Sequence, residues 1–297
     1  MDLSKKYWIS TNETINKETR NILNEYLLNL KLANKAEATI TKYKSILEIF
    51  LSECTIPLDE LTSENILSWI QIYSVNKKEK TVLLVLSTLT TFFNFCLAEE
   101  YIERVLLKKR WRPKIPQSLP KYLNEQEYSR VKVTAEQLSL RDRGLVLFLL
   151  SSGCRRSEVA QLIIEDVDFD KRTVQVKGKG NKIRNVHFSI ECALVIKEYL
   201  STRKYTPTDP LFLNRWGQPL QQNGIYKVTK NLGELAELPQ RLHPHCCRHT
   251  FATHLLAKGA ELQFIADEMG HTNLNTTRVY ARIPTEDMII AYQNIMG

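Results

Sequence analysis

The chain has 297 residues, of which 43% are hydrophobic, and its 41 lysines and arginines exceed its 33 aspartates and glutamates to give a net charge of +8. This length suits one large or two medium domains, and the hydrophobic content is ordinary for a globular protein. No apolar run reaches transmembrane length, and the polar N-terminus is not a signal peptide. We therefore expect a cytoplasmic protein that does not bind membranes, and the positive charge favours a polyanionic partner.

The first hundred residues repeat apolar side chains at helical spacing. The repeats cover 17–31, 37–53 and about 81–99, and Ser63 is expected to cap a further helix that runs through Ile66 and Ile70. This pattern predicts a compact helical bundle, and we assign residues 1–105 to it.

Residues 106–120 differ in composition from what precedes them. Three prolines exclude a long helix there, and the stretch 104–121 holds seven basic residues and no acidic one. We interpret 106–120 as an extended basic linker that lies along a polyanion, with an ordinary solvated loop as the alternative. The candidate contacts to this polyanion are Lys108, Lys109, Arg110 and Arg112.

Residues 121–297 are expected to form a mixed α/β domain. Helical patterns begin near 125 and 141 and return over 190–203, and from Pro244 onward the chain is expected to be mostly helical, with breaks at Gly259 and Gly270. Between them, 173–189 alternates on both sides of a Gly-Lys-Gly-Asn turn, which predicts a β-hairpin. The predicted fold is therefore mainly α with a small β-hairpin or sheet, in two domains.

Six side chains of this second domain suit the cutting of a phosphodiester without a metal or other cofactor. Arginine forks can grip the phosphate while charge builds in the transition state, and a tyrosine hydroxyl can attack it. A cationic pocket should favour the phenolate, with His245 as base and Lys179 at the hairpin tip to protonate the leaving oxygen. Each residue alone has an ordinary structural explanation, but together they form an ordered set: Arg155, Lys179, His245, Arg248, His271 and Tyr280.

A zinc site is the competing interpretation of residues 243–254, which contain four histidines and two cysteines. Adjacent cysteines point about 100° apart on a helix, and no second ligand pair stands at finger spacing. The histidines at 245 and 249 lack the glutamate of a metalloprotease helix between them. We therefore expect no metal site.

These motifs resemble those of the tyrosine recombinase (phage integrase) family, and of its Xer-type members in particular. The matching positions are the Gly-x-Arg-x-Ser-Glu box from Gly153 to Glu158, the hairpin motif 178–184, the His-x-x-Arg-His box from His245 to His249, and the box from Gly270 to Tyr280, where Met269 replaces the usual leucine. The resemblance adds three supporting residues, Glu158, Lys182 and Arg184.

The resemblance implies a helical core-binding domain and a catalytic domain that clamp double-stranded DNA with inverted-repeat core sites. It also implies a homotetramer on two synapsed sites, or a heterotetramer with a paralogue. Strand exchange would pass through 3′-phosphotyrosine intermediates and a Holliday junction, for resolution of dimers or cointegrates or for integration of a mobile element. The alternatives are a type IB topoisomerase-like relaxase and a catalytically idle DNA-binding relative.

Three features depart from the family pattern or extend it. Arg156 follows Arg155 directly, but the spacing to Glu158 selects Arg155 as the phosphate ligand. His243 stands where serine or threonine is usual. The last residues are expected to form an apolar stripe on a helix: Met288, Ile289, Tyr292, Ile295 and Met296. The resemblance to Xer-type members implies that this stripe docks on a neighbouring protomer, with packing on its own domain as the alternative.

Overall fold

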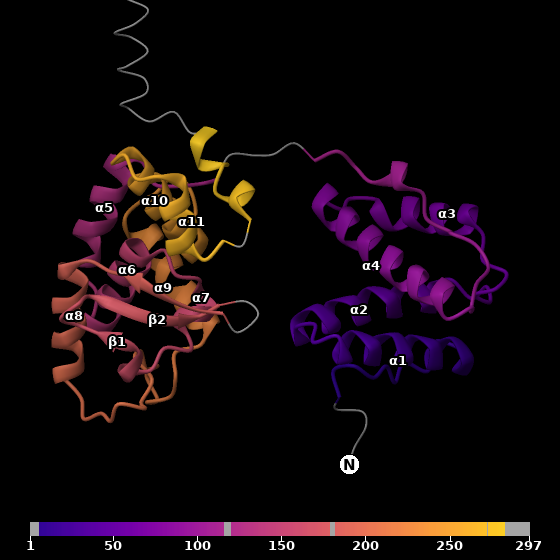
Figure 1. The fold of residues 1–297 in the computed structure, drawn as a ribbon, viewed down its shortest axis with the longest axis horizontal. Coiled ribbons are helices and arrows are strands. Elements are labelled where there is room, and N and C mark those ends of the chain that lie inside the picture. Colours follow the sequence, from indigo (N-terminus) through magenta and orange to yellow (C-terminus); the bar gives the residue numbers. More distant parts are fainter. Residues whose placement is uncertain (1–5, 116–119, 179–181, 272, 283–297) are drawn as a thin grey trace, which may run out of the picture. The chain divides into compact units, whose positions relative to one another are not determined.

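The computed structural model describes residues 6–115, 120–178, 182–271 and 273–282, and the chain divides into two compact units, Met1–Gln117 and Ser118–Gly297. Unit 1 contains four helices, in indigo to magenta in Figure 1: α1 (Lys17–Leu32), α2 (Glu37–Glu53), α3 (Ser63–Ser74) and α4 (Glu79–Ala98). All four were expected from apolar spacing. Their facing side chains make one core, in which the Phe50 and Trp69 rings meet edge to face.

Helix α4 is apolar enough to raise a question about its role. It has 20 residues, and an 18-residue window within it has a mean hydropathy of 1.8, so by length and composition it could cross a membrane, and the expectation that no segment reaches that standard is wrong. In unit 1 its buried side chains, among them Leu89, Phe92 and Phe93, pack against α1 and α2. Its apolar character is therefore that of the central helix of a bundle.

The start of α3 corrects one sequence expectation. Thr62, and not Ser63, caps this helix, in a reciprocal capping box with Asn65. Ser63 instead donates to the carbonyl oxygen of Leu106 at 2.8 Å. Leu106 is 2% exposed, and Lys109–Trp111 forms a short 3₁₀ turn. The first half of the predicted linker is thus packed on unit 1.

Unit 2 contains a three-stranded antiparallel sheet and a larger set of helices, from magenta to yellow in Figure 1. The predicted fold class, mainly α with a small β-sheet, is confirmed. The elements are α5 (Glu125–Ala135), α6 (Leu140–Ser152), α7 (Arg156–Val159), β1 (Val167–Asp168), β2 (Thr173–Lys177), β3 (Ile183–His187), α8 (Ile190–Ser201), α9 (Gln222–Leu235), α10 (Pro244–Ala257) and α11 (Leu262–Met269).

Two of these elements were not predicted. Strand β1 has only two residues, which is too short for an alternating pattern to be visible. Helix α9 contains Gly224 and Gly233, which lower its intrinsic helix propensity. It is held by burial of Ile225, Thr229 and Leu232 on one face.

The core of unit 2 places the ends of two helices side by side. Helix α6 is buried along most of its length and packs on α8 and α10. It ends at Gly153, with φ of 61°, where an added Cβ would lie 2.3 Å from the Phe251 ring of α10. Helix α11 ends in the same left-handed conformation at Gly270, with φ of 62°. Glycine is required at both positions, and a candidate site residue follows each turn, Arg155 two residues after Gly153 and His271 directly after Gly270.

Candidate active site

Five of the six predicted catalytic residues line one pocket of about 500 Å³. They come from three segments of unit 2: the start of α7, helix α10 and the chain that follows α11. The residues are Arg155, His245, Arg248, His271 and Tyr280. Lys179 and the apolar tail lie outside the described residues, and Lys182 is exposed just before β3. Arg156 is not among the residues that line the pocket.

Arg155 is oriented by a carboxylate on the next turn of chain. Its backbone N–H and its Nη1 donate to Glu158 at 2.7 and 2.8 Å, and Nη2 donates to the carbonyl oxygen of Gly270 at 3.4 Å. The side chain of Arg155 keeps 31% of its surface exposed, whereas that of Glu158 keeps 3%. The guanidinium is therefore held in one direction while still open to a ligand.

Arg248 is held by carbonyl oxygens from the two glycine turns. Nη1 donates to Gly153 at 2.5 Å and Nη2 to Met269 at 2.6 Å. The residue is 4% exposed. Burial, followed by the nearby Arg155, lowers the pKa of Arg248 to about 10, so it stays protonated at neutral pH. The turns that end α6 and α11 therefore fix a buried cation beside the pocket.

The side chain of Tyr280 is buried inside the protein. It is 1% exposed and packs in an apolar cluster with Phe251, Ile265 and Met269. Its hydroxyl lies 2.8 Å from Nδ1 of His249. Burial raises the pKa of Tyr280 to about 12, and Arg248 offsets only part of this rise. The expectation that the cationic pocket lowers this pKa is wrong for this conformation, because desolvation outweighs the nearby charge.

The pocket histidines are neutral at physiological pH. Loss of hydration and nearby cations lower the pKa of His249 and of His271 to about 4 each. Desolvation, together with His243 and Arg248, also lowers the pKa of His245. Nδ1 of His271 lies 2.8 Å from the hydroxyl oxygen of Thr277, which orients the ring. A neutral ring has one nitrogen that can accept a proton and one N–H that can donate a hydrogen bond to a phosphate oxygen.

His243 stands where serine or threonine is usual and still caps the N-terminus of α10. Its Nδ1 accepts from the backbone N–H of Cys246 at 3.0 Å and so caps α10. Cys246 and Cys247 are both fully buried. Among the described residues, no three histidine, cysteine or acidic side chains gather as metal ligands do.

The sequence reasoning did not assign a role to His249 or Glu268. His249 stands in the matched box, four residues after His245, so helical spacing could have placed it beside the pocket. Glu268 accepts from the backbone N–H of His187 at 3.2 Å and lies 2.8 Å from its ring. No spacing rule links α11 to β3, so nothing in the sequence indicates this contact.

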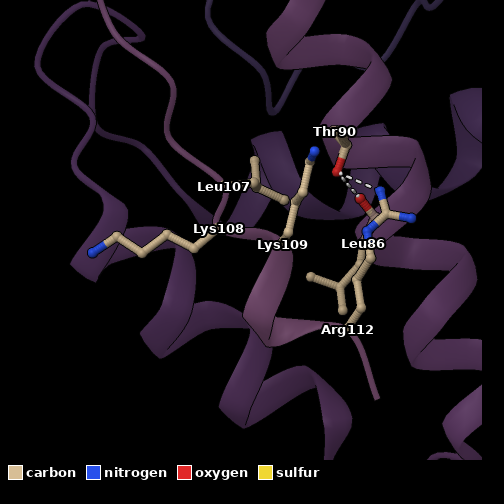
Figure 2. Close-up of a pocket in the computed structure, with 6 residues that line it drawn as sticks. All are labelled: Leu86, Thr90, Leu107, Lys108, Lys109 and Arg112. Atoms are coloured by element: carbon tan, nitrogen blue, oxygen red, sulfur yellow. Dashed lines mark hydrogen bonds between the residues drawn. The ribbon is translucent and has the colours of Figure 1, made fainter. Parts of the chain in front are cut away.

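The predicted DNA contacts of the linker lie in unit 1. Lys108, Lys109, Arg110 and Arg112 are all exposed. Figure 2 shows Arg112 and Lys109 near Thr90 and Lys108 extending away from them. Arg112 Nη2 donates to the Thr90 hydroxyl at 3.3 Å. The ion pairs of the described residues all lie in unit 2, so these cations have no carboxylate partner there.

Comparison with known proteins shows which family the chain belongs to. The profile of the Phage integrase family matches residues 121–286. Tyrosine recombinase XerC of Bacillus subtilis is 32% identical over 234 residues, 75% of this chain and 77% of the relative. Tyrosine recombinase XerA of Pyrococcus furiosus is 32% identical over 273 residues, 90% of this chain and 91% of the relative.

Solved structures agree with the sequence comparison. The XerH site-specific recombinase, in a post-cleavage complex with its palindromic difH substrate, has a TM-score of 0.75 at 23% identity, over 97% of this chain and 92% of that chain. A lambda integrase dimer bound to a COC′ core site has a TM-score of 0.73 at 18% identity, over 88% of this chain and 94% of that chain. The family profile and the two relatives thus identify the chain as a member of the phage integrase family: it is a tyrosine recombinase, an enzyme that cuts and rejoins DNA at specific sites.

Proposed function

We propose that Tyr280 is the nucleophile of this recombinase and that Arg155 and Arg248 bind the phosphate it attacks. The observation that carries the proposal is the single pocket lined by these three residues together with His245 and His271. Two guanidinium groups fixed by backbone and carboxylate contacts can stabilise charge that develops on a phosphate without rearranging. The proposed roles of Lys179, as proton donor, and of Lys182 rest on the matched hairpin motif.

The proposed cleavage step is balanced without an external reactant. The Tyr280 oxygen forms a bond to phosphorus, and the bond from phosphorus to the 5′-oxygen breaks. The phenolic proton passes to a pocket histidine, and the leaving 5′-oxygen takes a proton from Lys179. The product is a 3′-phosphotyrosine and a free 5′-hydroxyl. Attack by the 5′-hydroxyl of another strand reverses the step and releases Tyr280.

The structure favours one refinement of this step. The Tyr280 hydroxyl contacts His249, whereas the sequence reasoning proposed His245 as base. A pKa near 4 for His249 and near 12 for Tyr280 makes direct proton transfer between them costly in the stored conformation. We therefore keep His245 as the proposed base for an attacking Tyr280 that has left His249.

The two units have distinct proposed tasks. Unit 1 with its basic segment is the core-binding domain, and unit 2 is the catalytic domain. The DNA partner is a duplex with inverted-repeat core sites, bound by a tetramer of this chain or of this chain with a paralogue, in the cytoplasm. The palindromic substrate named for the XerH relative and the lambda integrase dimer on a core site support such a symmetric arrangement. The biological task is resolution of dimers or cointegrates, or integration of a mobile element.

Covalent capture from a random-sequence library tests the proposal. Duplexes that carry a nick in one strand let the short product diffuse away after cleavage, so the phosphotyrosine adduct accumulates. We expect the purified protein to capture a related set of inverted-repeat sequences, whereas Tyr280→Phe binds the same duplexes and captures none. Adducts that persist in Tyr280→Phe would contradict the assignment of the nucleophile.

The captured duplex then separates the recombinase from its alternatives. An idle DNA-binding relative forms no adduct. A type IB topoisomerase-like relaxase removes supercoils from a plasmid with one captured site but makes no recombinants from a plasmid with two. We expect recombinants and Holliday junctions from the two-site plasmid.

A further inference from the structure

Arg184 reaches from the β2–β3 hairpin toward the end of α11. Its backbone pairs with Val176 across the sheet, and its side chain is only 15% exposed. Nη1 and Nη2 donate to the two carboxylate oxygens of Glu158, at 3.0 Å each. Nε donates to the carbonyl oxygen of Glu268 at 3.1 Å. One guanidinium thus joins β3, α7 and α11.

The turn after α11 is built closely over this guanidinium. A Cβ at Gly270 would lie 2.9 Å from three of its atoms, so the turn and the Arg184 side chain must fit together. The Gly270 carbonyl oxygen accepts from Nη2 of Arg155, and His271 follows directly in the chain. A displacement of Arg184 would therefore move two residues of the pocket.

Glu158 connects Arg184 to Arg155. Its Oε1 accepts from both guanidinium groups, and its Oε2 accepts from Arg184 and from the Arg155 backbone N–H. Burial alone would raise the pKa of Glu158, but the bonds from Arg184 and then from Arg155 lower it. A carboxylate that accepted a proton would lose acceptor sites for Arg155.

We propose that Arg184 is a positioning residue for DNA cleavage: it holds the Glu158 carboxylate and the Gly270 turn in place, and through both it sets the direction of the Arg155 guanidinium. The inference rests on the proposed role of Arg155 as a phosphate ligand. It does not depend on Lys179. Without Arg184, Glu158 keeps its burial and loses its main partner, so its pKa rises and Arg155 is released as the pH falls.

The other charged groups near Glu158 do not replace Arg184. Arg155 is already bound to the carboxylate, and Arg248 is directed at backbone carbonyl oxygens. Among the residues that the structure describes, the other titratable groups that line the neighbouring cavity or interact electrostatically with this carboxylate are Asp166, Lys177 and Cys154.

The main test uses Arg184→Lys, which keeps the charge and most of the side-chain volume but cannot bind both carboxylate oxygens and Glu268 at once. Arg184→Gln removes the charge, and Arg130→Gln, at an exposed position of α5, is the matched control. Single-turnover cleavage is measured on the captured duplex at saturating protein. We expect Arg184→Lys to cleave about 10²-fold more slowly, with unchanged DNA binding. In Arg184→Gln, cleavage should begin to fall at a higher pH than in wild type and control as the pH is lowered from about 8 to about 5.

A second substrate shows which step fails. A 5′-bridging phosphorothiolate has a sulfur leaving group that departs without a proton, so it rescues defects in leaving-group protonation. We expect no rescue of Arg184→Lys, because the defect lies in the grip on the phosphate. Rescue to the wild-type rate would overturn the proposal, and so would wild-type cleavage of the ordinary duplex by Arg184→Lys.

A measurement on the protein without DNA distinguishes a failure of the Arg184 proposal from a failure of the proposed function. The carboxyl-carbon NMR signal of Glu158, assigned with Glu158→Gln, should titrate at higher pH in Arg184→Gln than in wild type. An unchanged titration midpoint in a folded variant, or a variant that loses stability but keeps a wild-type pH profile, would leave Arg184 a purely structural residue. If wild-type protein captures no DNA, the proposed function fails while the titration still decides the link between Arg184 and Glu158.

Discussion

The cations of the two units are held in opposite ways. In unit 2, Arg155, Arg184 and Arg248 are all tied to buried acceptors, namely the Glu158 carboxylate and carbonyl oxygens of the glycine turns. In unit 1, Lys108 and Lys109 are exposed, and Arg112 has only the Thr90 hydroxyl as a described partner. Both sets are proposed to meet phosphates, but only the first is already held by acceptors within the protein.

The difference corresponds to two tasks that charge can perform on DNA. A transition state is stabilised by donors that already point at the developing charge, because reorientation during the reaction costs free energy. Attachment to a duplex depends on the number of phosphates neutralised and on the counterions released, and flexible side chains serve this purpose well. The proposed roles thus differ: the arginines of unit 2 would act on the cleavage rate, and the basic segment of unit 1 on affinity.

The largest effect is expected for Arg248. Arg248→Ala should reduce single-turnover cleavage of the captured duplex by about 10³-fold or more, since removal of one donor to developing charge costs roughly 10²–10³-fold and Arg248 offers several. Binding to the same duplex should change little, because the residue is 4% exposed before cleavage begins. Circular dichroism controls for folding, and loss of binding equal to loss of cleavage would remove the distinction between the units.

Arg155 and Arg156, which are adjacent at the start of α7, allow a more direct test of the difference between an effect on cleavage rate and an effect on affinity. Arg155→Ala should reduce cleavage by about 10²–10³-fold, while Arg156→Ala, which removes the same charge one residue later, should act only on affinity. The measurement is the cleavage rate at saturating DNA for the two variants in parallel. A severe Arg156→Ala and a mild Arg155→Ala would mean that the matched box is read one residue out of register.

Substitutions in the basic segment of unit 1 should change the affinity for DNA and its salt dependence, but not the cleavage rate. Changing Lys108, Lys109, Arg110 and Arg112 together to glutamine should flatten the plot of log binding constant against log salt, by up to about 0.9 for each phosphate that is no longer neutralised. Target and random duplexes should be weakened alike, and cleavage at saturation should stay within about twofold of wild type. An unchanged salt slope would reduce this segment to an ordinary loop.

The smallest effect concerns stability. His249→Phe leaves the buried Tyr280 hydroxyl without its described partner, which should lower the free energy of unfolding by about 1–3 kcal/mol in denaturant titrations. Arg112→Gln, at an exposed side chain, should change it by less than about 0.5 kcal/mol. Equal losses would show that the basic segment is as much a part of the fold as the pocket is.

The sequence predicts most helices of both units because their apolar spacing is strong, and the ordered motifs indicate the residues that share the pocket. It does not predict the cap at Thr62, because Ser63 is an equally good capping residue next to it. It also does not reveal that the end of α11 lies over Arg184, since that contact joins segments more than eighty residues apart. The raised pKa of Tyr280 follows from burial, which no motif encodes.

The storage of Tyr280 among Phe251, Ile265 and Met269 bears on the safety of the genome that this enzyme searches. A DNA-binding protein meets an immense excess of unrelated duplex before it reaches a target. A permanently exposed phenol would risk a nick at each of those encounters. If Tyr280 is the nucleophile, as we propose, its hydroxyl must first leave an apolar cluster and His249, so cutting requires a rearrangement as well as contact with DNA. On that proposal, fidelity depends on the resting position of the nucleophile as well as on recognition of the bases.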